Sequence, residues 1–178
     1  FRGKGLHHLP EGAAIITPNH QSFFDGLFVT AFLKRKTIKN TYFYAKRKHV
    51  KNRFLKFMAH RNNVIIMDTN FDLKESIQKM AAVLKEGKKI IIFPEGTRTT
   101  TGKLGEFKKT FAILSTELNV PVIPVAIRGA YDALPAGSRF PKPFRKIEVN
   151  YLEPVYPNGY SFDSLTQKVK DLINQHVS

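Results

Sequence analysis

Thr17-Pro18-Asn19-His20-Gln21-Ser22-Phe23-Phe24-Asp25 lies between a short apolar run, residues 13–16, and an amphipathic run that ends at Leu33. A short apolar run bounded by polar residues is typical of a buried strand, whereas apolar residues at helical spacing predict a helix over 22–33. The segment therefore predicts a turn from a strand at 13–17 into a helix. Ligands of open α/β sheets bind beyond the carboxyl ends of such strands, so a functional site is expected at this turn.

A histidine and an aspartate stand five positions apart in the turn. Ser22 is a residue type that caps helices well, and as a cap it would place Asp25 in the first helical turn and leave His20 on the preceding loop. The carboxylate can then fold back and accept a hydrogen bond from one imidazole nitrogen, which leaves the other nitrogen as a proton acceptor in a fixed tautomer. These are the base and the orienting acid of a Ser-His-Asp triad without its nucleophile, so the reacting hydroxyl would come from a substrate.

Two other interpretations stay open at this point. Ser22-Phe23-Phe24-Asp25 fits the capping-box pattern, in which Asp25 does no more than satisfy backbone amides at a helix start. A hydrolase with Ser22 as nucleophile and His20 as base is a further alternative, although adjacent turn positions give poor geometry and the chain lacks a Gly-x-Ser-x-Gly elbow. The spacing of His20 and Asp25 is too common to decide among these interpretations by itself.

The rest of the chain alternates predicted strands with predicted helices. Further strands are expected at 41–45, 64–67, 89–93, 120–127 and 146–152, and further helices at 71–86, 106–118 and 162–177. This alternation predicts an α/β fold, with a mixed, largely parallel β-sheet covered by helices. Pro121 and Pro124 cannot donate to a sheet ladder, so the strand 120–127 is expected at an edge or in an irregular position. Lys34-Arg35-Lys36 supply the cations that a helix C-terminus favours, and they are expected to end the first helix.

A second polar turn, Pro94-Glu95-Gly96-Thr97-Arg98, follows the predicted strand 89–93. Gly96 permits close approach of the backbone to a ligand, and the planar guanidinium of Arg98 can bind two phosphate oxygens at once. Glu95 cannot bind an anion, and it is expected to accept hydrogen bonds from substrate hydroxyls or an amine, or to hold a neighbouring cation. A plain surface turn with a surface ion pair is the alternative. Because both turns follow strands, they are expected to meet at one edge of the sheet.

Length and composition favour one folded domain over residues 1–178. The chain has 178 residues and a hydrophobic content of 42%, which suit a single domain with a substantial core. The absence of cysteine excludes a disulfide framework, thiolate metal ligands and a cysteine nucleophile, and no metal site is expected. No apolar stretch approaches the ~20 residues that a transmembrane helix needs. The first residue is Phe1 rather than methionine, which is compatible with a domain excised from a larger protein.

The chain is strongly basic, with 29 Lys and Arg residues against 14 Asp and Glu residues and a formal net charge of +15. Such a charge favours anionic partners, whether nucleic acid, anionic lipid, phosphorylated cofactors or an acidic protein. The densest basic segment, 46–58, fits either the solvated face of a packed helix or a basic amphipathic helix on a membrane surface. A nucleic-acid-binding module is the alternative class of protein, and steeply salt-dependent affinity for DNA or RNA would favour it.

Three blocks of the sequence, 19–25, 93–98 and 120–125, match in order three of the four sequence blocks of the glycerolipid acyltransferases, of the lysophospholipid or 1-acylglycerol-3-phosphate type. The chain resembles this family from Phe1 to about Leu152. Three ordered blocks at suitable separations are far more specific than one histidine and one aspartate. The resemblance implies a glycerol-3-phosphate acyltransferase-like fold.

The same resemblance implies a reaction and its residues. His20, oriented by Asp25, would deprotonate a hydroxyl of an acceptor lysophospholipid, and the alkoxide would attack an acyl thioester without forming an acyl-enzyme. The donor would be acyl-CoA or acyl-acyl carrier protein, and no other cofactor is implied. The acceptor would be bound by the second turn, Glu95, Gly96, Thr97 and Arg98, with Arg98 near the phosphate. Transfer of the acyl group to water, a thioesterase reaction, is the related alternative.

The resemblance also implies partners and a location. The expected partners are a lysophospholipid, an acyl thioester that can be carried by an acidic carrier protein, and the cytoplasmic face of a membrane, on which the protein is peripheral. No nucleic acid is expected, because that class leaves both strand-end turns unexplained. The run 64–69 ends in Thr69 where the family commonly has arginine, which favours an acceptor with a head group over lysophosphatidic acid. Residues 98–104 are similar to the acyltransferase part of bacterial 2-acylglycerophosphoethanolamine acyltransferases that are fused to an acyl-acyl carrier protein synthetase.

Overall fold

The computed structural model describes residues 1–46, 64–67, 73–135, 138, 142 and 145–177. Most of the basic segment 46–58 lies outside these residues, and so does Thr69, so the interpretations given for them stay predictions. Among the described residues, no helix combines the length and the apolar character needed to cross a bilayer.

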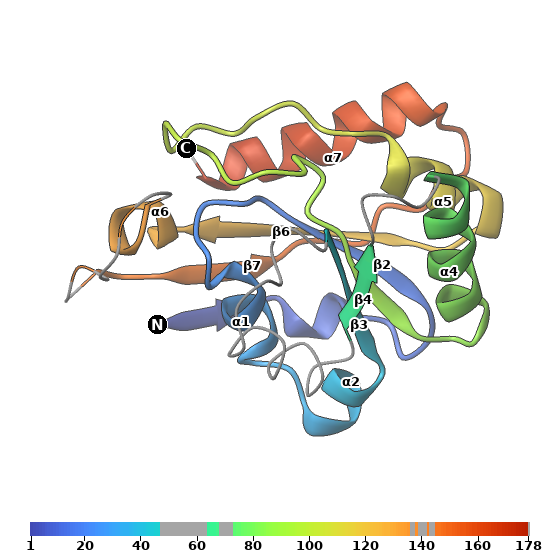
Figure 1. Ribbon diagram of the computed structural model, residues 1–178, viewed down its shortest axis with the longest axis horizontal. Coiled ribbons are helices and arrows are strands. Elements are labelled where there is room, and N and C mark those ends of the chain that lie inside the picture. The colour runs from blue at the N-terminus through green and yellow to red at the C-terminus, as the bar shows by residue number, and fades with distance from the viewer. Residues whose placement is uncertain (47–63, 68–72, 136–137, 139–141, 143–144, 178) are drawn as a thin grey trace.

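Within the described residues, seven strands form one sheet in the order β1-β7-β6-β2-β5-β3-β4 (Figure 1). The strands are β1 (Arg2–Lys4), β2 (Ala14–Pro18), β3 (Thr41–Lys46), β4 (Val64–Met67), β5 (Lys89–Ile91), β6 (Val122–Arg128) and β7 (Glu148–Tyr151). All neighbouring pairs are parallel except β6 and β7. The prediction of a mixed, largely parallel sheet is therefore confirmed.

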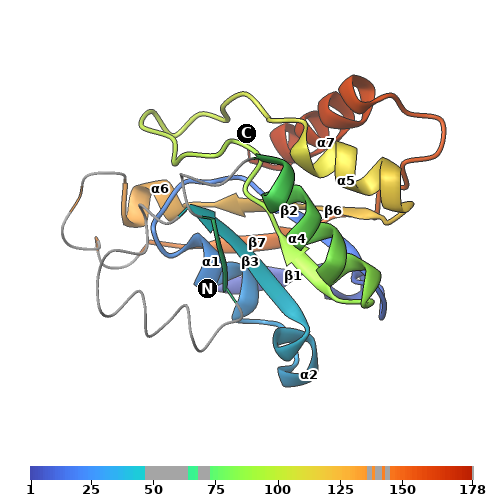
Figure 2. The same ribbon diagram turned by 45° about the vertical axis from the view of Figure 1, so that its right-hand side comes forward.

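Helices cover both faces of the sheet (Figures 1 and 2). The first face packs against the three longest helices of the described residues, α4 (Leu73–Lys85), α5 (Thr110–Leu118) and α7 (Phe162–Val177). The second face packs against α1 (Asp25–Thr30), the short helix α2 (Arg35–Lys39), the 3-10 turn η1 (Leu6–His8) and α6 (Ala130–Ala133). Both faces are therefore buried, as βαβ connections require of parallel strands.

Alternating side chains of β2 supply both hydrophobic cores. Ile15 lies in the core under α4, α5 and α7, whereas Ile16 lies in the core under α1, and both are fully buried. Successive side chains of a strand point to opposite faces, so this apolar run serves two layers at once. Each buried isoleucine stabilises the fold by about 1.5–3 kcal/mol. β2 thus forms a rigid base for the turn that follows it.

Of the two positions predicted for the proline-containing strand, an edge or an irregular one, the edge is wrong, because β6 lies between β2 and β7. Pro121 precedes β6, and its carbonyl accepts a hydrogen bond from the Ile15 amide. The carbonyl of Pro124 accepts a hydrogen bond from Leu152, which lies just beyond the last residue of β7. Proline has no backbone N–H, and the hydrogen bond that Pro124 cannot make would lie beyond the last paired residue of β7. An interior strand therefore tolerates a proline at this position.

Two predicted helix boundaries are also wrong. The first helix is shorter than the predicted 22–33, and Lys34-Arg35-Lys36 do not end it, because Lys34 has extended backbone and caps the start of α2. The predicted helix 106–118 begins only at Thr110. The Lys108 amide donates to the Pro94 carbonyl instead of joining a helix, which ties this segment to the second polar turn. At this second boundary a contact distant in sequence overrides the local pattern.

Candidate active site

The two polar turns meet at the carboxyl ends of neighbouring parallel strands, as predicted. β2 pairs with β5 in parallel, so the turn after Pro18 and the turn after Ile91 leave the same edge of the sheet. The Thr99 amide donates to the His20 carbonyl at 2.8 Å. This bond joins the two turns directly, and it makes them one site.

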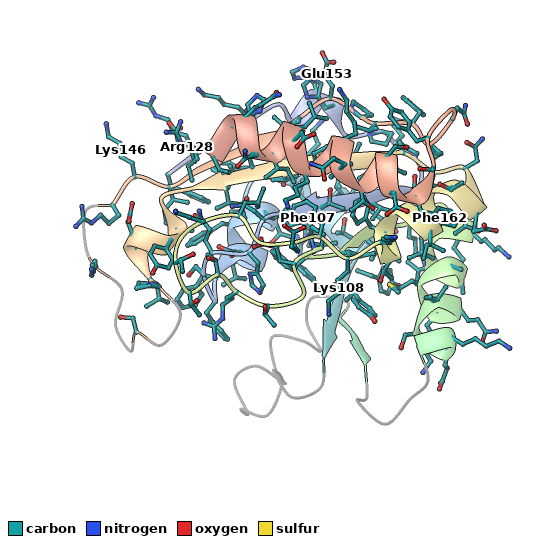
Figure 3. All side chains as sticks on the ribbon, turned by 90° about the horizontal axis from the view of Figure 1, so that it is seen from above. Phe107, Lys108, Arg128, Lys146, Glu153 and Phe162 are labelled. Carbon is teal, nitrogen blue, oxygen red and sulfur yellow. The ribbon has the colours of Figure 1, made fainter. Side chains whose placement is uncertain are left out.

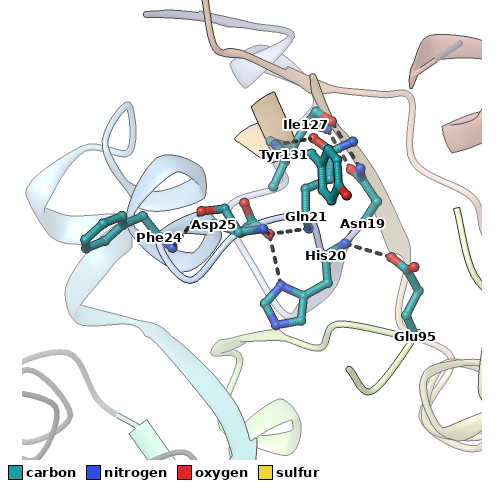
Figure 4. A network of polar contacts seen from close by, with 9 residues as sticks. Asn19, His20, Gln21, Phe24, Asp25, Glu95, Ile127 and Tyr131 are labelled. Carbon is teal, nitrogen blue, oxygen red and sulfur yellow. Dashed lines mark hydrogen bonds and ion pairs between the residues drawn. The ribbon is translucent and has the colours of Figure 1, made fainter. Parts of the chain in front are cut away.

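His20 and Asp25 form the expected contact (Figure 4). His20 Nδ1 lies 2.9 Å from Asp25 Oδ2, with the His20 side chain 22% exposed and the Asp25 side chain fully buried. The contact fixes Nδ1 as the protonated nitrogen when the ring is neutral, because a carboxylate oxygen only accepts. Among the described residues none bonds the other nitrogen, Nε2, so it is free to accept a proton from a ligand hydroxyl.

Asp25 also satisfies the backbone at the helix start, so the two interpretations of this residue hold together. Its Oδ2 atom accepts hydrogen bonds from the amides of Gln21 at 2.6 Å and Ser22 at 2.7 Å. The predicted cap at Ser22 is wrong, because Phe24 is the N-cap residue and its side chain makes no capping bond. Three N–H donors thus converge on one carboxylate oxygen, and this holds the carboxylate fixed relative to the ring.

The ring of His20 is held on its face as well as at Nδ1. It stacks on Phe93 with 4.2 Å between ring centroids and 29° between ring planes. Phe93 follows β5, so the strand next to β2 supplies this support. One hydrogen bond and one stacking contact hold the ring in a single orientation before a substrate binds. Such pre-positioning is what a general base needs. Sequence reasoning assigned no role to Phe93.

Glu95 binds two backbone amides, a role that sequence reasoning missed. Its Oε1 atom accepts from the His20 amide at 2.7 Å, and its Oε2 atom accepts from the Gly105 amide at 2.8 Å. Burial raises the pKa of the Glu95 carboxyl, and the two amide donors oppose this rise. Each oxygen already has a backbone partner, while the expected bond to a substrate hydroxyl or amine stays a prediction. No local sequence signal indicates contacts so distant in the chain.

Glu95, Thr97 and Arg98 of the second turn line a cavity of about 540 Å³ together with most of the loop 99–108, whereas Gly96 does not line it. Arg98 lies in its wall with Lys103 and Lys108, so three cations surround the space. Gly96 has a positive φ of 73°, and an added Cβ would lie 3.1 Å from the end of the Lys108 side chain. The Arg98 guanidinium also lies 6.0 Å from the centre of the Phe23 ring. The turn therefore supplies a cationic cavity that suits a phosphate.

Residues on either side of His20 anchor the turn to the next strand. Asn19 donates through Nδ2 to the Ile127 carbonyl at 3.0 Å and accepts the Ile127 amide at 2.7 Å (Figure 4). Gln21 Oε1 accepts from the Tyr131 amide at 3.3 Å, and the Tyr131 hydroxyl donates to the Thr100 carbonyl at 2.8 Å. These bonds link the ends of β2 and β6 with the loop after Arg98. Sequence reasoning noted Asn19 and Gln21 only as parts of a block.

Within the part of the chain that the structure describes, no group of three His, Cys, Asp or Glu side chains could hold a metal ion. The site offers a fixed imidazole, a cationic cavity and several oriented amides. The oxyanion donor is one function that sequence reasoning could assign only to an unspecified backbone amide.

The sheet and its strand-end site define an α/β domain in which a carboxylate-bound histidine and a cationic turn meet at one edge of the sheet. A family model described as Acyltransferase matches residues 1–128. The chain therefore belongs to the acyltransferase family, and the resemblance found in the sequence is confirmed.

A solved structure shares the fold over almost the whole chain. The crystal structure of the 1-acyl-sn-glycerophosphate (LPA) acyltransferase from Thermotoga maritima superposes with a TM-score of 0.79 and 27% sequence identity. The match covers 98% of this chain and 69% of that protein. The predicted α/β acyltransferase fold is confirmed by this match.

Curated relatives carry the same enzyme name. A chloroplastic 1-acyl-sn-glycerol-3-phosphate acyltransferase of Arabidopsis thaliana is 27% identical over 179 residues, which cover 98% of this chain and 48% of that protein. A probable 1-acyl-sn-glycerol-3-phosphate acyltransferase of Mycoplasma pneumoniae is 26% identical over 162 residues, 86% of this chain and 61% of that protein. The enzyme of this name from Cocos nucifera is 34% identical over 97 residues, 54% of this chain and 31% of that protein. The chain thus spans only part of the length of these relatives.

Proposed function

We propose that this protein transfers a fatty acyl group from an acyl thioester to the free hydroxyl of a lysophospholipid of the 1-acylglycerol-3-phosphate type. The observation that carries the proposal is the contact of His20 Nδ1 with Asp25 Oδ2 at 2.9 Å beside a cationic cavity. Membership of the acyltransferase family and the names of the relatives support the same reaction. The donor is acyl-CoA or an acyl-acyl carrier protein.

In the proposed reaction, His20 acts as general base and Asp25 orients it. Nε2 takes the proton from the acceptor hydroxyl, the oxygen attacks the thioester carbonyl, and the C–O bond forms as the C–S bond breaks. The imidazolium then returns the proton to the departing thiolate. A positioned base contributes about 10²–10⁴-fold to the rate. Holding two substrates together supplies further acceleration by removing their relative motion.

In the same proposal, the acceptor phosphate binds in the cavity at the second turn. Arg98 gives a planar fork for two phosphate oxygens, and Lys103 and Lys108 add charge around the same space. Glu95 binds the His20 amide and borders the cavity. Acceptor binding and the base are thereby coupled through one side chain. Gly96 lets the backbone approach the acceptor closely, and Thr97 supplies a hydroxyl.

The acceptor is a lipid, so we place the protein peripherally on a membrane surface at the cytoplasmic face. Phe1, Phe23 and Leu27 are large apolar side chains that are 58%, 42% and 41% exposed. Phe23 lies three positions after His20, so an apolar contact with the lipid would bring the membrane to the site. The net charge of +15 favours anionic lipid.

The test combines one substitution with a substrate panel. The protein is assayed with acyl-CoA or acyl-acyl carrier protein against lysophosphatidic acid and lysophosphatidylethanolamine in vesicles, with lipid products measured by mass spectrometry and free thiol measured in parallel. His20→Ala should lower kcat by about 10²-fold or more, whereas His176→Ala, which changes an exposed histidine, should not. Unchanged turnover in His20→Ala would contradict the mechanism. Thiol release without lipid product would indicate a hydrolase.

A further inference from the structure

A second cavity lies at the same edge of the sheet, between the ends of β6 and β7. Its volume is about 650 Å³, within the range of sites for small molecules. We call it the β6–β7 cavity. Its walls contain six groups of residues: Gln21, the loop 101–103, Arg128 and Gly129, Tyr131 and Asp132, Lys146 and Glu148, and Val177. Of these residues, Lys103 alone is assigned a role in the proposed reaction, because it also lines the cavity at Arg98.

In the described part of the chain, the cations of the β6–β7 cavity form no ion pairs with carboxylates. Lys103, Arg128 and Lys146 line it, and none of them belongs to an ion pair of the described residues. Arg128 and Glu148 are cross-strand partners of β6 and β7, yet their charged groups do not pair. Unpaired cations around a concave surface raise the local potential and favour an anionic ligand.

The backbone holds two of these cations side by side. Gly129 has a positive φ of 76°, and an added Cβ would lie 2.0 Å from the Lys146 carbonyl oxygen. The turn after Arg128 therefore passes directly against Lys146. Arg128 and Lys146 lie next to each other at one end of the molecule, apart from Lys108 of the first cavity (Figure 3). Two cations on neighbouring stretches of backbone suit a ligand with more than one negative oxygen.

The β6–β7 cavity borders the catalytic turn without including the base. Gln21 lines it and directly follows His20 in the chain, and Tyr131, also in the wall, holds Gln21 in place. Thr101 and Lys103 line both this cavity and the cavity at Arg98. The loop 101–103 therefore borders two cationic spaces, which suit the phosphates of two substrates.

We propose that the β6–β7 cavity binds the phosphate-bearing nucleotide end of a coenzyme A thioester, the acyl donor. This assignment rests on the proposed function and deepens it, because it selects the donor. Lys103, Arg128 and Lys146 bind phosphate oxygens. Asp132 and Glu148, which also line the cavity, accept hydrogen bonds from the ribose hydroxyl and the adenine amino group. The long arm of coenzyme A then carries the thioester past Gln21 to His20.

The two carboxylates decide between a nucleotide and an acidic carrier protein. A carrier protein would bring further carboxylates against Asp132 and Glu148, and like charges at close range repel. A nucleotide offers hydrogen-bond donors to these carboxylates and phosphates to the cations. A concave space of this size also suits a small molecule better than the convex surface of a protein. The observed mixture of charges therefore favours the nucleotide.

The test measures binding of adenosine 3′,5′-bisphosphate by isothermal titration calorimetry. Arg128→Gln and Lys146→Gln should each raise its Kd by roughly tenfold or more, since each removes a hydrogen bond to a charged group. Lys85→Gln is the matched control, because Lys85 is an exposed cation at the end of α4, far from the cavity (Figure 1). The KM for acyl-CoA should rise in the first two variants, with the KM for the lysophospholipid unchanged. Thermal unfolding confirms that each variant is folded.

Three outcomes would overturn the assignment. The first is absence of bisphosphate binding to the wild-type protein, and the second is equal binding by all three variants. The third is that Arg128→Gln and Lys146→Gln raise the KM for acyl-acyl carrier protein and leave the KM for acyl-CoA unchanged. Competition by phosphoethanolamine at matched concentration would likewise assign the cavity to a lipid head group instead. The bisphosphate should still bind to His20→Ala, and Arg128→Gln should still weaken its binding. These two results would support the nucleotide site even if the protein transferred no acyl group, so the failure of one proposal can be told from the failure of the other.

Discussion

At the scale of single residues, Asp25 joins folding and chemistry in one atom. Its Oδ2 accepts from the His20 ring and from two backbone amides, while its Oδ1 is buried with no hydrogen-bond partner among the described residues. An unpartnered buried oxygen is costly unless something else fixes the group. Here the three bonds to the other oxygen fix it, so the orientation of the imidazole is built into the start of α1.

Asp25→Asn should therefore impair catalysis while the fold persists. The amide oxygen can replace Oδ2, but it cannot stabilise an imidazolium as a carboxylate does, so kcat should fall by about 10²-fold or more. The amide nitrogen would occupy the buried position of Oδ1 without an acceptor and destabilise the protein by about 1–3 kcal/mol. Kinetics and chemical denaturation measure the two effects. The control is Asp163→Asn, which changes an exposed ion pair with Lys109 and should alter neither kcat nor stability appreciably. A kcat close to that of wild type in Asp25→Asn would exclude the orienting role.

Glu95 acts on the base through the backbone, so Glu95→Gln should lower kcat more than it raises either KM. Glutamine keeps one acceptor oxygen but turns an NH₂ group toward the His20 or the Gly105 amide, and one of the two bonds is lost. Steady-state kinetics with both substrates separate kcat from KM. The control is Glu106→Gln, which changes an exposed carboxylate paired with Lys170. A rise in lysophospholipid KM alone would assign Glu95 to acceptor binding instead.

The raised pKa of Glu95 also predicts a pH dependence of stability. The folded state holds the Glu95 proton more tightly than the unfolded chain, so this residue favours folding most at low pH, and its contribution is lost as pH rises through its folded-state pKa. The free energy of unfolding of wild type relative to Glu95→Gln should therefore increase as pH falls from neutral toward the ordinary pKa of glutamate. Urea denaturation at several pH values measures this difference. A difference that shrinks over the same range would mean that the sign is wrong.

At the scale of elements, the junction between β2 and β6 positions the catalytic turn. Asn19 is almost completely buried and binds both backbone groups of Ile127. Asn19→Ala would leave a buried N–H and a buried C=O unpaired, and it should destabilise the protein by about 1–3 kcal/mol for each group. Asn40→Ala, which removes one exposed bond to the Lys36 carbonyl, should stay within ~0.5 kcal/mol of wild type. Denaturation curves compare the free energies of unfolding of the two variants. Equal losses would contradict the stabilising role of the bonds between Asn19 and Ile127.

Elements with a complete local pattern could be predicted from the sequence. The helix expected at 162–177 is α7, because Leu165, Val169 and Ile173 repeat at helical spacing and face the core. The strand expected at 13–17 is β2, shifted by one residue. The contact of His20 with Asp25 was also predictable, because both residues lie in one turn.

Features that depend on distant partners could not be predicted. β6 is interior although it contains Pro124. The backbone N–H that Pro124 lacks is not needed there, because β7 ends at this position. The start of α5 is delayed because the Lys108 amide binds Pro94. Glu95 looked like a substrate ligand because no local pattern signals its bonds to His20 and Gly105. Each of these outcomes is set by tertiary contacts, which local propensity does not encode.

At the scale of the whole molecule, exposed apolar side chains and unopposed cations occur together around α1 and α2. Both α1 and α2 pack against the second face of the sheet, and this face includes the exposed Phe23 and Leu27. The segment 34–36 at the start of α2 carries three exposed cations and no carboxylate. Apolar side chains beside unopposed cations are the pattern of a surface that docks on anionic lipid. The proposed orientation places His20 near the membrane from which its acceptor comes.

Arg35→Gln/Lys36→Gln should therefore weaken binding to vesicles that contain anionic lipid, with little effect on neutral vesicles. Each near-surface cation contributes about 1 kcal/mol, so the double variant should bind roughly 30-fold more weakly at low salt. Lys85→Gln/Lys168→Gln removes the same charge from helices on the other face and is the matched control. Vesicle sedimentation measures binding, and added salt should narrow the gap between the two variants, because it screens exposed charges. If both double variants lost the same affinity, net charge alone would drive binding and the orientation proposed for α1 and α2 would be wrong.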